Sequence, residues 1–356
     1  MGEIRAAISL FLRKRQSARH PALPWLFNLL LTSITALGQS HQTPPVASRP
    51  VFDSKPTFVY KQFQANQPVH LIAYGDMRFT DPAVTNGTNP KVRRWLAEKI
   101  GQENPQALML TGDMPFTGEK TADWDEYQRE TASWKADGFP VFPTMGNHEI
   151  YHDREKGIAN YLANYPQIDG HRYYSALLGP VEVISLDMNS GVGARSDQLR
   201  WFVGQLDHLP PSVEFLFILY HIPWVADTQS QLVASLPSKD ALVLRGALES
   251  RVNRIHAKVV VLSGHIHNYE RFERHGVEYV VTGGGGAEPY PILFRGSHDL
   301  YRDSGFPVYH YLTIDVRDHQ LHAVMWKVSD PAVPETSLKV EMKDRFTIKA
   351  TPPKKP

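Results

Sequence analysis

The chain carries, at residues 258–286, the stretch KVVVLSGHIHNYERFERHGVEYVVTGGGG. Its first six residues form a short, mostly apolar run, which is typical of strands that are buried on both faces of a sheet. The next four residues, GHIH, place two imidazoles two positions apart, so an extended loop can present both to one metal ion. A second strand is predicted over residues 277–282. The glycines at 283–286 lack the Lys-Ser/Thr ending of a nucleotide-binding loop, so they predict a tight turn near the metal site.

Four more short apolar runs earlier in the chain have the same design. Each ends in Gly, Asp, Asn or His: VHLIAYGD (69–76), ALMLTGD (107–113), VFPTMGNHE (141–149) and EFLFILYH (214–221). Amphipathic stretches with helical spacing lie among these runs, at residues 90–100, 121–136, 196–209 and 241–256. The alternation of strand and helix predicts an α/β fold whose ligand sites lie just beyond the strand ends.

The later part of the chain is richer in strand patterns. Residues 277–282, 308–315 and 321–328 predict a second sheet packed on the first. The folded domain is expected to span residues 68–329, with a peripheral C-terminal tail at 330–356. Trp124, Tyr127 and Trp134 recur at helical spacing, and we interpret them as core side chains rather than as a surface for stacking bases.

Composition excludes several classes of protein. The 356 residues suffice for one large or two ordinary domains. The formal net charge of +1 gives no general attraction to nucleic acid or to an anionic membrane. The absence of cysteine excludes disulfides, thiolate metal sites and a cysteine nucleophile, whereas the 16 histidines are a reason to look for metal.

The first 67 residues have the pattern of an export signal and a tether. A basic stretch precedes an apolar run at 23–37, and Ala36 and Gly38 supply small residues at a cleavage point, so residues 1–38 are predicted to be a secretory signal. Residues 39–67, rich in Pro, Ser, Thr and Gln, predict a tether. We therefore expect a secreted or periplasmic protein with no other membrane association. An uncleaved anchor is the alternative, although the apolar run is shorter than the roughly 20 residues that a span needs.

The polar residues at the strand ends indicate a site only when they are taken together. A Gly-Asp pair alone is most often a turn, and a lone histidine is more often structural than a ligand. Together, the five strand ends offer oxygen and nitrogen ligands without thiolate, which suit zinc, iron or manganese rather than calcium. Two such cations about 3.5–4 Å apart activate a bridging water and clamp phosphate oxygens, which favours phosphoryl transfer chemistry.

The order of these blocks resembles the calcineurin-like metallophosphoesterase superfamily. The blocks are GD-x, GD-xx, GNHE, a single histidine after a strand, and GH-x-H, and they cover roughly residues 68–326. The HIPW run at 221–224 and the long GHIHNYERF block are similar to the purple acid phosphatase branch. This resemblance implies a four-layer αββα sandwich, in which two mixed β-sheets are flanked by helices.

The resemblance also implies a role for each matching residue. It implies two divalent or trivalent metal ions, with Asp113 as the carboxylate that bridges them. One metal would be bound by Asn147, His221 and His265, and the other by Asp76 and His267. His148 matches a histidine that binds no metal but contacts the phosphate and assists the leaving group.

Two positions depart from the family pattern. Arg78 replaces a histidine of the wider superfamily, and Phe116 replaces the tyrosinate of purple acid phosphatases. Neither side chain can bind a metal, because guanidinium stays protonated and a phenyl ring has no donor atom. Tyr74, Tyr269 or a water molecule would have to complete that site. The purple colour depends on the tyrosinate, so we predict its absence.

Arg78 and Glu149 support these ligands in the same interpretation. Arg78 would grip a phosphate with its planar fork, or alternatively pair with a nearby carboxylate. Glu149 would orient a neighbouring imidazole.

The leading hypothesis is hydrolysis of a small phosphomonoester by a metal-bound hydroxide, with His148 and Arg78 as catalytic and substrate-binding residues. A phosphodiesterase or nucleotidase on the same fold is the first alternative, although the near-neutral charge argues against a nuclease and no nucleic acid partner is expected. A weak, one-metal phosphate-binding relic is the second alternative.

Overall fold

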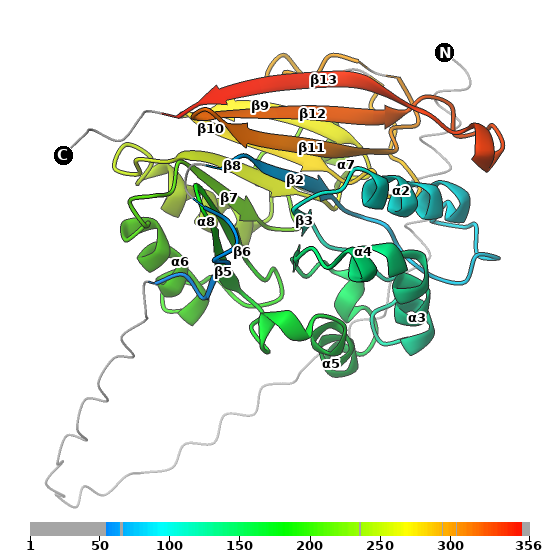
Figure 1. The fold of residues 1–356 in the computed structure, drawn as a ribbon, viewed down its shortest axis with the longest axis horizontal. Coiled ribbons are helices and arrows are strands. Elements are labelled where there is room, and N and C mark those ends of the chain that lie inside the picture. The colour runs from blue at the N-terminus through cyan, green and yellow to red at the C-terminus, as the bar shows by residue number, and fades with distance from the viewer. Residues whose placement is uncertain (1–54, 65–66, 235, 294, 304, 351–356) are drawn as a thin grey trace, which may run out of the picture. The chain divides into compact units, whose positions relative to one another are not determined.

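Two mixed β-sheets form the centre of the protein (Figure 1). The computed structural model describes residues 55–64, 67–234, 236–293, 295–303 and 305–350. The predicted signal at 1–38 and most of the predicted tether lie outside these residues. Within the described part of the chain, no helix is both long enough and apolar enough to cross a membrane.

The seven-stranded sheet has the order β1-β5-β6-β7-β8-β10-β9, and the six-stranded sheet has the order β13-β12-β11-β2-β3-β4. The strands of the first sheet are β1 (Phe58–Val59), β5 (Tyr174–Leu178), β6 (Val181–Ser185), β7 (Phe215–Leu219), β8 (Lys258–Ser263), β10 (Val277–Thr282) and β9 (Tyr269–Arg274). Those of the second are β13 (Val340–Lys349), β12 (Gln320–Val328), β11 (His310–Arg317), β2 (Val69–Tyr74), β3 (Ala107–Leu110) and β4 (Val141–Pro143). Parallel pairing of β2, β3 and β4, and of β6, β7, β8 and β10, brings their carboxyl ends to common edges.

Strand alternation divides the apolar side chains between two cores. On β7, Phe215, Phe217 and Leu219 enter the core that lies between the sheets, while Leu216 and Ile218 enter the core on the helix-covered face. A strand buried on both faces must be apolar throughout, which explains the continuous runs in the sequence. The αββα sandwich of two mixed sheets is as expected, but the later strands do not form a sheet of their own. Strand β10 joins β8 in the seven-stranded sheet, whereas β11 and β12 extend the six-stranded sheet from β2.

Helices cover the outer faces of the two sheets (Figure 1). The helices of the described residues are α2 (Pro90–Gln102), α3 (Thr121–Glu130), α4 (Ala132–Asp137), α5 (Arg154–Asn164), α6 (Asp197–Asp207), α7 (Thr228–Ala234) and α8 (Lys239–Glu249), with short 3₁₀ turns at His148–Ile150, Pro166–Ile168 and Glu335–Ser337. Side chains of α2, α3 and α4 pack in the core of the six-stranded sheet, and those of α6 and α8 pack on the seven-stranded sheet. Trp124, Tyr127 and Trp134 are buried, as predicted.

Two predicted helices differ from those observed. The helix expected at 121–136 is divided at Thr131, whose hydroxyl donates to the Tyr127 carbonyl at 2.7 Å and whose backbone leaves helical geometry. The helix expected at 241–256 begins earlier, where Ser238 caps it, and ends at Glu249.

Several strands were not predicted, namely β1, β5, β6, β9 and β13. The stretch expected to be a tail contributes β13, which pairs with β12 at the edge of the six-stranded sheet. Its burial alternates between half-buried and exposed residues, so it has none of the continuous apolar character that marks the central strands.

Candidate metal centre

Six polar side chains converge where the carboxyl ends of strands from both sheets meet. Asp76 follows β2, Asp113 follows β3 and Asn147 follows β4, while His221 follows β7 and His265 and His267 follow β8. These are the six residues that the sequence analysis singles out as ligands.

The loops that carry these residues approach one another closely. A Cβ on Gly264 would lie 2.2 Å from the Asp76 carboxylate, and one on Gly146 would lie 2.3 Å from Asp113, so both positions require glycine. Asp76, Asp113 and His265 have φ values of 58°, 56° and 68°, a left-handed conformation that is costly for residues with a side chain. Tight loops and strained backbones of this kind gather at functional sites.

The first group of polar atoms surrounds Asn147. Its Oδ1 lies 3.2 Å from His221 Nε2 and 3.0 Å from His265 Nδ1. Asp113 Oδ1 lies 3.3 Å from the same His221 nitrogen. Four potential ligand atoms from four strand ends therefore face one another.

The second group consists of Asp76 and His267. His267 Nε2 lies 3.5 Å from Asp76 Oδ1, and both oxygens of Asp76 accept a hydrogen bond from the backbone N–H of His265 at 3.0 Å. Asp76, Asp113 and His221 offer atoms that all lie within 4.8 Å of one another, so the two groups are contiguous.

Hydrogen bonds to carbonyl groups fix the orientation of the imidazoles. His221 Nδ1 lies 2.8 Å from the Thr111 carbonyl, and His267 Nδ1 lies 2.7 Å from that of Glu288. Since a carbonyl only accepts, each Nδ1 carries the proton and each Nε2 presents a lone pair to the cluster. His267 Nε2 and Asp113 Oδ2 are buried and have no hydrogen-bond partner, which fits bound cations.

The electrostatics of the cluster suit cation binding. Burial and the proximity of Asp113 raise the pKa of Asp76 well above its ordinary value. Burial also opposes ionisation of Asp113, but His221, His148 and Arg78 together hold its pKa below the ordinary value. Burial lowers the pKa of His265 to about 4, so this imidazole is neutral and available as a ligand at neutral pH.

His148 stands beside the cluster rather than within it. Its Nδ1 lies 2.6 Å from the Phe116 carbonyl, and its Nε2 lies 3.9 Å from Asp113 Oδ2. Burial lowers the pKa of His148; Asp113 acts against this change and Arg78 adds to it. The exposed ring of Tyr151 stacks on the imidazole, with 5.3 Å between ring centroids.

Arg78 lies on the same side of Asp113 as His148. One of its guanidinium nitrogens is 3.6 Å from Asp113 Oδ2, and its charged group lies 6.0 Å from the centre of the Phe116 ring. The side chain is 15% exposed, and its Nε is buried without a hydrogen-bond partner. Pairing with a carboxylate is therefore observed, and the Nε donor makes no hydrogen bond.

The expected role of Glu149 needs correction. Its carboxylate accepts hydrogen bonds from the backbone N–H groups of Asp113 (3.2 Å), Met114 (2.8 Å) and Gly146 (2.7 Å). The buried side chain thus joins two ligand-bearing loops through their backbones, and none of its described hydrogen bonds is to an imidazole. The prediction followed the general habit of carboxylates near metal sites to orient ligand imidazoles.

The tyrosines suggested as replacement ligands point elsewhere. The Tyr269 hydroxyl donates to Asp344 at 2.9 Å, and the buried Tyr74 ring packs edge-on against Trp134. Tyr290, which sequence reasoning did not select, stacks on His267 with 4.4 Å between ring centroids. No pattern in the sequence marks this residue, because it reaches the site from the irregular segment after the glycine run.

Comparisons with known proteins agree on one family. The sequence model of the calcineurin-like phosphoesterases matches residues 69–284. The chain is 26% identical to purple acid phosphatase 22 of Arabidopsis thaliana over 62% of this chain and 49% of that protein. It is 25% identical to purple acid phosphatase 21 of the same plant over 70% of this chain and 58% of that protein. The chain thus spans about half the length of these curated relatives.

A solved structure shows the same fold. A purple acid phosphatase from yellow lupin (Lupinus luteus) seeds superposes with a TM-score of 0.63 at 17% identity, over 81% of this chain and 55% of that one.

Proposed function

Since the chain belongs to the calcineurin-like phosphoesterase family, we propose that it hydrolyses small phosphate monoesters with the help of two bound metal ions. The observation that carries this proposal is the convergence of six unprotonated or ionisable ligand atoms from both sheets. Two of them, Asp113 Oδ2 and His267 Nε2, are buried without a hydrogen-bond partner.

We assign the ligands to two positions. Asn147, His221 and His265 would hold one ion, Asp76 and His267 would hold the other, and Asp113 would bridge them. Iron, zinc or manganese suits this set of oxygen and nitrogen donors. When bound, such cations activate water and neutralise charge on the phosphate.

The chain's own residues then perform two tasks. His148 Nε2 is free of the backbone carbonyl that binds Nδ1, so it faces the space beside Asp113. Because Nδ1 already donates to that carbonyl, Nε2 would donate a proton to the departing oxygen from the imidazolium form, in which both ring nitrogens carry protons. Arg78, on the same side of Asp113, would bind the phosphate oxygens.

The test is hydrolysis with defined metal content. The purified protein is treated with chelator, dialysed and assayed on a panel of phosphate monoesters and diesters, before and after zinc, manganese or iron is restored. We expect turnover of monoesters to disappear with the metal and to return with it. Unchanged turnover after complete metal removal would refute the proposal. Faster turnover of diesters than of monoesters would show that diesters are the substrate class instead.

A further inference from the structure

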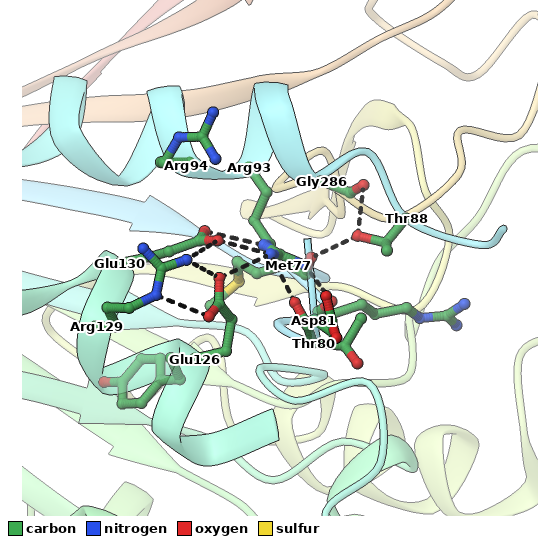
Figure 2. Close-up of polar contacts among 12 residues, drawn as sticks. Met77, Thr80, Asp81, Thr88, Arg93, Arg94, Glu126, Arg129, Glu130 and Gly286 are labelled. Atoms are coloured by element: carbon green, nitrogen blue, oxygen red, sulfur yellow. Dashed lines mark hydrogen bonds and ion pairs between the residues drawn. The ribbon is translucent and has the colours of Figure 1, made fainter. Parts of the chain in front are cut away.

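Arg93 on α2 is a charged side chain with no exposed surface, and it lies against the loop that follows β2. Figure 2 shows its guanidinium entering a group formed by Glu126, Glu130 and Thr80, while Arg94 points away from it. Arg93 donates two hydrogen bonds to the Glu130 carboxylate, at 3.0 and 2.6 Å. Its charge is therefore paired by a planar two-point contact.

The remaining donors of Arg93 bind the backbone of the loop. Nη1 donates to the Arg78 carbonyl and Nη2 donates to the Thr80 carbonyl, each at 3.0 Å. On the other side of the loop, the N–H groups of Asp76, Arg78 and Phe79 donate to the backbone carbonyls of residues 112–114. The loop is thus fixed through its carbonyls on one side and through its N–H groups on the other.

This loop needs such support because its backbone is strained. Asp76 and Arg78 both adopt left-handed φ values, 58° and 53°. Such conformations are costly for residues with a side chain and persist only where the surroundings impose them. The Arg78 carbonyl that Arg93 holds belongs to one of these two residues, and the orientation of that peptide determines where the Arg78 side chain points.

A purely structural purpose would not call for an arginine here. Buried ion pairs can often be replaced by apolar side chains of similar volume without loss of stability. An arginine is distinguished by its ability to bind a carboxylate and two separate carbonyls at once from one rigid plane. The contacts of Arg93 are of this kind, because they join one carboxylate to two carbonyls of the loop that carries Arg78.

We propose that Arg93 is a positioning residue for Arg78: by holding the carbonyls of Arg78 and Thr80, it keeps the Arg78 guanidinium beside Asp113 and so sets the affinity of the site for a phosphate group. This inference rests on the proposed function, because it takes Arg78 to be a phosphate-binding residue.

The test is a double-mutant cycle on the metal-loaded protein. Inorganic phosphate is the probe, and its affinity is measured by calorimetry for wild type, Arg93→Lys, Arg78→Ala and the double variant. We expect Arg93→Lys, which keeps the charge but not the plane of donors, to weaken phosphate binding about tenfold, as contacting residues typically couple. Added to Arg78→Ala, it should cause no further loss. For any ester that the wild type hydrolyses, Arg93→Lys should also lower kcat/KM by about 10- to 100-fold.

Arg94→Lys is the matched control, because the neighbouring arginine pairs with Glu335 instead of the loop. It should leave phosphate affinity unchanged. If Arg93→Lys does not fold, Arg93→Met with Glu130→Met removes both charges and leaves the two carbonyls without their donors, so it should show the same weakening.

Unchanged phosphate affinity in a folded Arg93 variant, or equal losses with and without Arg78, would overturn the inference. A wild-type protein that binds phosphate and cleaves no ester would refute the proposed function alone, and the affinity cycle would still decide the role of Arg93.

Discussion

At the scale of single residues, His148 offers the sharpest test of the chemistry. Removing a general acid typically costs about 10²–10⁴-fold in rate, but only where the departing oxygen needs a proton. We expect His148→Asn to reduce kcat strongly for an alkyl phosphate and much less for p-nitrophenyl phosphate, whose phenolate leaves without protonation. Steady-state kinetics on both substrates measures this difference.

His152 provides the control for this substitution. It is an exposed histidine with a φ of 67°, a conformation that asparagine tolerates well. His152→Asn should leave both rates unchanged. Equal losses on the two substrates in His148→Asn would show that His148 binds phosphate but does not protonate the leaving group.

Phe116 is the residue on which our prediction about the protein's colour depends. Its ring contacts both the Arg78 guanidinium and the His148 imidazole, at 6.0 and 5.9 Å between centres. A tyrosine at this position matches the family's tyrosinate. We therefore expect ferric Phe116→Tyr protein to gain a visible absorption band that the ferric wild type lacks.

The spectrum of Tyr290→Phe serves as the control, because Tyr290 stacks on His267. A visible band in the wild type that disappears in Tyr290→Phe would contradict the prediction and identify Tyr290 as the phenolate ligand.

At the scale of elements, the sequence predicts the central strands because burial on both faces requires continuous apolar runs. Strands β7 and β8 are examples, and each ends two residues before a histidine of the cluster, His221 and His265 respectively. Strand β13 has no such run, since only its half-buried residues face the molecule. The position of a polar residue directly after a strand is a local signal, so all six candidate ligands could be selected from sequence.

No local signal in the sequence predicts the contacts of Glu149 and Arg93. Glu149 binds the backbone N–H of Met114, 35 positions away, and Arg93 pairs with Glu130, 37 positions away. Both act on backbone atoms or on distant side chains, which no spacing in the sequence specifies.

Strand β6 carries a buried acid that makes stability depend on pH. Glu182 is 1% exposed, and burial raises its pKa from the ordinary 4.5 to about 7. The folded state therefore binds this proton more tightly than the unfolded state, so stability falls as pH rises from about 4.5 through about 7. At pH 8 the loss from this one group is about 3 kcal/mol.

We expect Glu182→Gln to remove the part of the pH dependence of folding stability that this carboxyl group causes. In urea titrations the variant should match the wild type near pH 4 and exceed its stability by up to about 3 kcal/mol at pH 8. Glu98→Gln, on the exposed face of α2, is the control and should follow the wild type at every pH. A variant that is less stable than the wild type at pH 8 would contradict this account.

At the scale of the whole molecule, the candidate site joins the two sheets. Asp76 and Asp113 extend from the six-stranded sheet, while His221 and His265 extend from the seven-stranded sheet. Either of the two proposed cations would link the carboxyl edges of both sheets, because each position takes ligands from both, and their positive charge would relieve the repulsion that raises the pKa of Asp76. Metal binding and folding stability should therefore be coupled.

We expect chelation to lower the melting temperature and restored metal to raise it. A ligand at 100 times its dissociation constant stabilises the folded state by about 2.7 kcal/mol, which corresponds to a shift of several degrees in a domain of this size. Asp113→Asn keeps the shape of the side chain and the oxygen that accepts the His148 N–H, but it removes one of two buried negative charges. Calorimetry should show that the melting temperature of the variant rises less with added metal than that of the wild type. If instead both proteins melt at one temperature with and without metal, the six side chains do not form a site that joins the sheets.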